Sequence, residues 1–256
     1  MKKAIAFTER NIKELTRDPL SYIFCLGFPL IMLIIMSVIN ESIPPEAGMT
    51  LFQISKLCGG IMIFGQTFIM LFTALTVSQD RAGSFLVRMY ATPMVSADFI
   101  AGYTLPLFII ALAQGLITAA ASFVISLISG GTFSIPGALL AVAASMPSAL
   151  MFTSIGILFG TLFNEKAAPG LCSIVISLGS FLGCIFFDAE ATGGIMLTIC
   201  KIFPFFYCSK CARAAIALDL SGESFLIPLA IVSAWAAVLT GLAALAFGSR
   251  MKADLS

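Results

Sequence analysis

Histidine is absent from this 256-residue sequence, and charged residues make up only 11% of it. Without histidine, the chain has neither a His-ligated metal site nor a Ser/His/Asp triad. No glycine is followed by lysine, so the phosphate-binding loop GxxxxGK(S/T) is missing as well. We therefore expect no catalytic residue, no bound metal and no cofactor on this chain.

Long uncharged stretches account for this composition. Hydrophobic residues are 59% of the sequence, against about 45–50% in a soluble domain, which indicates that lipid surrounds the chain. The uncharged stretches are Pro19–Asn40, Leu57–Gln79, Phe99–Asn164, Ala167–Phe187 and Ser224–Ser249. Each is long enough for one bilayer crossing, and the third is long enough for two, with a turn-rich break at Gly130–Gly137. We predict a single all-α domain, residues 1–256, with six transmembrane helices at about 21–39, 58–78, 100–128, 138–163, 171–187 and 225–247.

Basic residues are distributed unevenly between the two sides of these predicted helices. If the N-terminus is inside, the inner segments hold ten of the fourteen lysines and arginines, namely Lys2, Lys3, Arg10, Lys13, Arg17, Arg81, Arg88, Lys166, Arg250 and Lys252. Acidic residues divide almost evenly, so the bias lies in the cations and places both termini in the cytoplasm. We expect a multi-pass protein of the plasma (inner) membrane, surrounded by the lipid bilayer and without a nucleic-acid partner.

The first 18 residues predict an amphipathic helix at the membrane interface. One face of this helix collects Ala4, Ile5, Ile12 and Leu15, and the opposite face collects Lys2, Arg10, Lys13 and Arg17. Phe7 falls outside the apolar face. Such a helix lies along the headgroups of the anionic inner leaflet. The alternative is a solvated leader that only sets the topology.

The outer segment 188–223, before the last predicted span, is apolar in two pieces that are each too short to cross. Pro204 interrupts it, which indicates a re-entrant helical pair. Cys208 and Cys211 form a CxxC motif here, and Cys200 lies nearby. A disulfide or a metal role is open for them, although plain packing is the more common role of cysteine within helices.

The six predicted spans contain no Asp, Glu, Lys or Arg, which disfavours a proton- or ion-coupled carrier. Gln66 and Gln114 are their strongest polar groups, and either helix contacts or a substrate pathway would satisfy these amides. Two GxxxG pairs, Gly156–Gly160 and Gly179–Gly183, allow close helix approach. Packing within one bundle and a dimer interface are both open for these glycines.

The inner loop 79–96 is the most patterned polar segment. Its characteristic residues are Asp80-Arg81, Gly83-Ser84, Arg88, Thr92-Pro93 and Ser96. Gly83 is expected to interrupt the helix of the second span, Pro93 to end a short following helix, and Ser96 to cap the third span, with Asp98 in its first turn. In the order of these residues, this loop resembles the cytoplasmic loop of permease subunits of type-2 ATP-binding-cassette exporters. Ser84 stands where that family usually has threonine, and Tyr103 where it often has lysine.

The resemblance extends over the whole chain and implies a function. It implies a permease that pairs with a second copy or a homologous permease, while separate cytoplasmic ATPase subunits bind ATP and magnesium. The implied ATPase-coupling loop comprises Asp80, Arg81, Gly83, Phe85, Arg88, Met89, Thr92 and Pro93, and a second inner contact comprises Asn164, Glu165 and Lys166. Phe85 and Met89, four residues apart, would offer the ATPase an apolar ridge. The alternatives are a charged connector that only anchors two spans and, for the whole chain, a six-span secondary carrier or channel without an ATPase.

Overall fold

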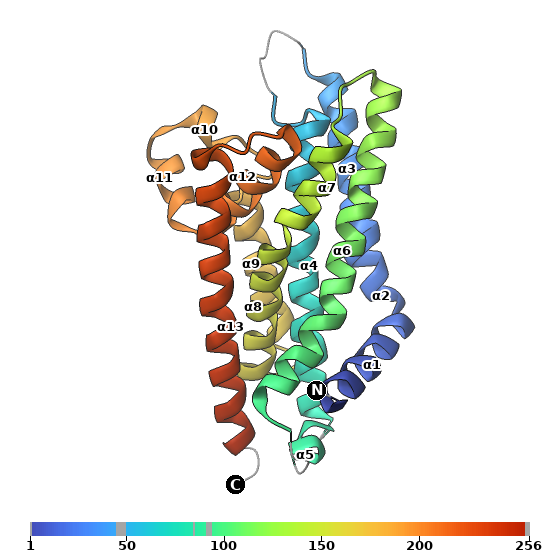
Figure 1. Cartoon of the computed structure of the whole chain (residues 1–256), viewed down its shortest axis with the longest axis vertical. Helices are drawn as coiled ribbons and strands as arrows, with labels where there is room; N and C mark the ends of the chain where they lie inside the picture. The colour runs from blue at the N-terminus through green and yellow to red at the C-terminus, as the bar shows by residue number, and fades with distance from the viewer. Residues whose placement is uncertain (1, 45–49, 84, 91–93, 254–256) are drawn as a thin grey trace.

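The computed structural model describes residues 2–44, 50–83, 85–90 and 94–253, and every regular element in these ranges is helical. The long helices run side by side as a bundle, and both chain termini lie at its lower end (Figure 1). We call this end the terminal end and the opposite one the far end. The all-α fold expected from the continuous apolar runs is confirmed.

Six passes build the bundle, joined alternately at the far end and the terminal end (Figure 1). They are α2–η1–α3 (Pro19–Tyr22, Ile23–Gly27, Phe28–Ser42), α4 (Ile54–Ala82), α6 (Ser96–Ser129), α7–α8 (Ile135–Ala144, Met146–Leu162), α9 (Ala168–Leu182) and η3–α13 (Gly222–Leu226, Ile227–Ala253). Five of these passes are long and apolar enough to cross a bilayer, whereas α9 has 15 residues. At about 1.5 Å per residue, α9 is shorter than the hydrocarbon core is thick.

The fifth predicted span, 171–187, therefore extends beyond the C-terminal end of the observed helix α9. The helix stops at Leu182, because Gly183 caps it and Cys184 adopts a left-handed conformation with φ 53°. The Arg213 guanidinium fixes this turn by donating to the Cys184 carbonyl at 2.7 Å. An arginine 29 positions away holds the turn, so the uncharged run alone does not reveal where this helix ends.

The far end also carries three short helices before the last pass: α10 (Ala189–Thr192), α11 (Gly194–Ile202) and α12 (Pro204–Ala217). The chain bends by 94° between α11 and α12, immediately before Pro204. Proline suits the first turn of a helix, where its missing N–H has no helical partner anyway. The predicted helical pair around Pro204 is confirmed.

Helix α4 is the centre of the bundle, and its tightest neighbour is α8. Gly156 and Gly160 make this contact possible, since a Cβ on Gly156 would lie 2.5 Å from the Met70 carbonyl oxygen and one on Gly160 2.7 Å from that of Ala74. This first GxxxG pair therefore serves packing within the chain. Of the two open roles, the structure selects the internal one here.

The N-terminal helix α1 (Lys2–Arg17) is confirmed, and a residue outside the predicted apolar face packs it against the bundle. Phe7 is buried, with 3% of its surface exposed, whereas Ile5 is 60% exposed. The reason is a socket on α6: at Gly102 an added Cβ would lie only 2.1 Å from the Phe7 ring. Tertiary packing against α6 thus decides which side of α1 turns inward, and it does so more strongly than the apolar pattern of the isolated helix.

Candidate functional site

A partly buried ion pair joins α1 to the end of α4 at the terminal end. Arg10 donates from both terminal nitrogens to the two Asp80 carboxylate oxygens, each at 2.7 Å. The Tyr103 hydroxyl of α6 donates to the same carboxylate at 2.7 Å. Asp80 is only 7% exposed, so one carboxylate connects three helices through charge-assisted hydrogen bonds.

Burial and charge act on Arg10 in opposite directions. Burial by itself lowers the pKa of the guanidinium, but hydrogen bonding and attraction from Asp80 more than offset it, and the pKa of Arg10 is raised. The Arg10 guanidinium therefore stays protonated at every physiological pH. Asn11, the next residue of α1, adds a buried bond from its side-chain amide to the Gly102 carbonyl at 2.9 Å.

Aromatic packing extends this joint to the short helix α5 (Phe85–Tyr90). The Phe7 ring lies 6.2 Å from the Phe85 ring in a stacked arrangement and 5.0 Å from the Tyr103 ring edge-on. The Arg10 guanidinium sits 4.0 Å above the Phe85 ring, which is cation–π geometry. Helix α1 thus contacts α5 through Phe7 and through Arg10, and Arg10 also binds Asp80. We call Phe7, Arg10, Asp80, Phe85 and Tyr103 the α1–α5 joint.

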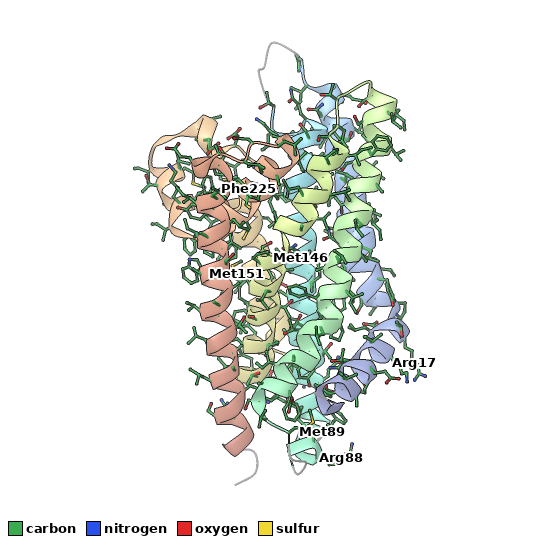
Figure 2. All side chains as sticks on the ribbon, viewed as in Figure 1. Arg17, Arg88, Met89, Met146, Met151 and Phe225 are labelled. Carbon is green, nitrogen blue, oxygen red and sulfur yellow. The ribbon has the colours of Figure 1, made fainter. Side chains whose placement is uncertain are left out.

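The two sides of α5 differ. Leu86 is fully buried against the bundle, and Phe85 is half-buried beneath α1. Met89 is half-buried as well, whereas Arg88 is exposed (Figure 2). The expected ridge of Phe85 and Met89 is therefore covered at Phe85 by α1, and Arg88 is the more accessible of the coupling-loop side chains.

The chain around α5 follows the predicted breaks in part. Helix α4 ends at Ala82 with Gly83 as its cap, as expected. The assignment of Ser96 as the cap of the next span is wrong: Val95 is the capping residue, and its N–H donates to the Asp98 carboxylate at 3.3 Å. The Asp98 carboxylate thus accepts from the N–H of the capping residue, as the acidic residue of a capping box does, while valine offers no side-chain acceptor to the first turn. Ser84, Thr92 and Pro93 lie outside the described residues.

Arg81 binds a different partner from its neighbour Asp80. It donates to the Gly160 carbonyl at 3.1 Å and to the Phe163 carbonyl at 3.2 Å, and so caps the end of α8. This contact brings the second inner segment against the base of α4. A hollow of about 740 Å³ results, lined by Ser78, Arg81, Ala82, Leu162, Phe163, Asn164, Glu165, Lys166 and Arg250. The structure therefore brings the two predicted inner contacts together at one end.

The remaining candidate residues lie elsewhere in the bundle. Gln66 connects α4 to the break between α7 and α8: its amide donates to the Ser145 carbonyl at 3.0 Å, and the Ser148 hydroxyl donates to its carbonyl oxygen at 2.6 Å. Gln114 donates to the Thr118 hydroxyl at 3.2 Å and fills the space that Gly65 leaves open. Both amides make contacts between or within helices, the first of the two roles left open for them.

The second GxxxG pair packs inside the chain as well. Both Gly179 and Gly183 face Phe205 of α12: an added Cβ would lie 3.7 Å from its ring and 3.3 Å from its carbonyl oxygen, respectively. These glycines and the two glutamines are separate from the α1–α5 joint. Gln66, for example, is 14 residues before Asp80, or about 21 Å along α4.

Sequence reasoning missed Phe7 and Tyr103 as members of the joint, and Asn11 beside it. One signal for α1 was present, because Phe7, Asn11 and Leu15 follow one another at intervals of four and are all buried. The pairing of Arg10 with Asp80 spans 70 positions and leaves no local pattern.

The loop between α4 and α6 thus carries a short helix, α5, at the terminal end of a multi-pass bundle. Residues 3–217 of the chain match the family model of ABC-2 type transporters. The chain belongs to the ABC-2 type transporter family. This family supplies the permease component of type-2 ABC transporters, so the chain is a multi-pass membrane transport component. The match extends from α1 through α12. No curated protein matches the sequence.

Proposed function

We propose that this ABC-2 permease is the membrane subunit of an ATP-driven exporter, that it works as a dimer, and that separate ATPase subunits bind ATP and magnesium and drive it. The observation that supports this most is the position of α5. This short helix lies outside the bundle, and α1 contacts it at Phe85. Because the α1–α5 joint connects α5 to α1, α4 and α6, we expect these helices to move together. A force applied to α5 would therefore reach two long helices of the bundle directly.

In this proposal, the terminal end faces the cytoplasm, in agreement with its excess of basic residues. Helix α1 then lies at the inner leaflet, with exposed Ile5 toward lipid and the buried Phe7 toward α6. The ATPase would contact α5 around Arg88 and the hollow beside Asn164, Glu165 and Lys166. Arg81 lines the same hollow and donates to the Gly160 carbonyl near the end of α8.

Copurification with a candidate ABC ATPase subunit that is coexpressed with this chain tests the proposal. Arg88→Glu reverses an exposed charge on α5. Arg17→Glu reverses an exposed charge at the C-terminal end of α1, away from α5 (Figure 2). We expect Arg88→Glu to reduce copurification at least fivefold and Arg17→Glu to leave it unchanged. Both variants should insert in the membrane normally.

The competing function is a secondary carrier or channel that needs no ATPase. Purified permease reconstituted alone in vesicles separates the two. Solute movement driven by an ion gradient in these vesicles would establish the carrier and refute the exporter.

A further inference from the structure

A cavity at the far end is lined by charged side chains from several elements. Its volume is about 220 Å³, and it lies between the start of α4, the turn after α9, α10 and α12. Sites for drug-sized ligands measure about 300–1,000 Å³, so this cavity has room for a small ligand only. Its charged lining comprises Lys56, Lys210 and Arg213 together with Asp188, Glu190 and Asp219.

Arg213 of α12 brings a half-buried guanidinium to this cavity. Its Nε donates to the Lys56 carbonyl at 3.2 Å, and its Nη2 donates to the Cys184 carbonyl at 2.7 Å. Gly60 provides the room, since an added Cβ would lie 3.1 Å from Nη2. Nη1 forms no hydrogen bond with a described residue, and no described carboxylate forms an ion pair with this arginine. Because a covered charge is normally paired, this guanidinium has donors and charge available for a ligand.

Lys56 adds a second cation to the same wall. Its ammonium donates to the Thr50 hydroxyl at 2.7 Å and makes no ion pair within the described part of the chain. Its carbonyl accepts from Arg213, which places the first turn of α4 beside the guanidinium. Lys210 differs, because its ammonium lies 3.1 Å from the Glu190 carboxylate. Two of these three cations therefore have no acidic partner among the described residues.

The two remaining acidic residues of the lining bind backbone N–H groups near them in sequence. Asp188 accepts from the N–H groups of Glu190 and Ala191 at 3.0 and 3.1 Å, at the start of α10. Asp219 accepts from the Ser221 N–H at 3.2 Å. These carboxylates thus leave the two cations unpaired, but their charges oppose the entry of a ligand with several negative charges.

We propose that this cavity binds the carboxylate of a small solute, with the Arg213 guanidinium and the Lys56 ammonium as its partners. A planar guanidinium offers paired N–H donors that match the two oxygens of a carboxylate. A single negative charge is balanced by the two cations, whereas a phosphate dianion would be repelled more strongly by Asp188 and Asp219. The bound carboxylate would also neutralise the side chain that joins α12 to α4 and to the turn at Cys184.

Saturation-transfer NMR with formate tests the site in the purified full-length protein. Formate is the smallest carboxylate, and its proton signal lies apart from those of detergent. We expect saturable transfer to formate, with a dissociation constant that rises by about fivefold in Lys56→Met, because one charge contact is lost. Lys201→Met removes an exposed lysine of α11 that does not line the cavity, and this matched control should bind formate as the wild type does. Acetate should compete with formate, and chloride at the same ionic strength should not.

Thermal unfolding gives an independent readout of the same site. Because a ligand that binds the folded state stabilises it, saturating formate should raise the midpoints of the wild type and Lys201→Met by about 3 °C, and that of Lys56→Met by less. Lys56→Met is the decisive variant, since substitution of Arg213 would also release the turn at Cys184. Absence of transfer to formate, or equal affinities in Lys56→Met and the wild type, would overturn the proposal. Displacement of formate by phosphate at a lower concentration than by acetate would overturn it as well.

Discussion

Helix α4 is held in two different ways along its length. In its middle it meets α8 through Gly156 and Gly160, whose missing side chains let the two backbones touch. At its end it meets α1 through an ion pair, with a tyrosine hydroxyl and aromatic rings around it. Close backbone packing tolerates almost no displacement, whereas long side chains can keep their bonds while helices shift slightly. The comparison suggests a rigid middle and a terminal joint that is able to transmit movement.

The largest effect is expected in the rigid middle. Gly156→Leu places a side chain against the Met70 carbonyl, where even a Cβ would lie at 2.5 Å. We expect a loss of about 4 kcal/mol or more, seen as a failure to obtain folded protein from detergent extracts. Gly241→Leu on α13, which has open space around it, is the matched control. If both variants fold equally well, the α4–α8 contact is not rigid.

Removing the Phe7 ring tests the aromatic part of the joint. Phe7→Ala should destabilise the protein by about 3 kcal/mol, because it empties the socket between Gly102, Phe85 and Tyr103. Thermal unfolding in detergent measures the change. Ile5→Ala, two residues away and exposed, should change the midpoint very little. A larger loss for Ile5→Ala than for Phe7→Ala would contradict the packing of Phe7 against α6.

Breaking the ion pair should have a moderate effect on stability. Arg10→Met retains much of the side-chain bulk but removes the guanidinium. Of the hydrogen bonds described above, only the one from the Tyr103 hydroxyl then reaches the buried Asp80 carboxylate. Arg10 is partly exposed, so we expect a loss of about 2–3 kcal/mol by thermal unfolding, below that of a fully buried pair. Restoration by the double variant Arg10→Met/Asp80→Leu would confirm that the unpaired charge is the cause. No gain in the double variant would assign the loss to packing.

The smallest effect is expected at Gln66. Gln66→Leu removes the bonds to Ser145 and Ser148, but the Ser145 carbonyl still accepts from the Ser148 hydroxyl and the Ala149 N–H. The cost should therefore be about 1 kcal/mol. Thr76→Val is the comparison, since the Thr76 hydroxyl donates only within its own helix. A much larger loss for Gln66→Leu would mean that the break in α7–α8 depends on this one amide.

Much of the fold was predictable from the length of the apolar runs, since each had to satisfy its own backbone as a helix. The break at Gly83 and the bend before Pro204 were predictable for local reasons as well. The joint was not, because Arg10 meets Asp80 across 70 positions and Phe7 inserts where α6 has a glycine. A helical pattern gives the apolar face of one helix, whereas these contacts depend on residues from two helices.

Photo-crosslinking tests most directly the central claim that α5, held by α1, receives the ATPase. A benzoylphenylalanine replaces Arg88 in one sample and Arg17 in another, and each permease is irradiated in membranes together with the ATPase subunit. We predict an adduct with the ATPase from position 88, none from position 17, and a yield from position 88 that falls when Arg10→Met is added. An intact complex that gives no adduct from position 88, or a yield that Arg10→Met leaves unchanged, would contradict the claim.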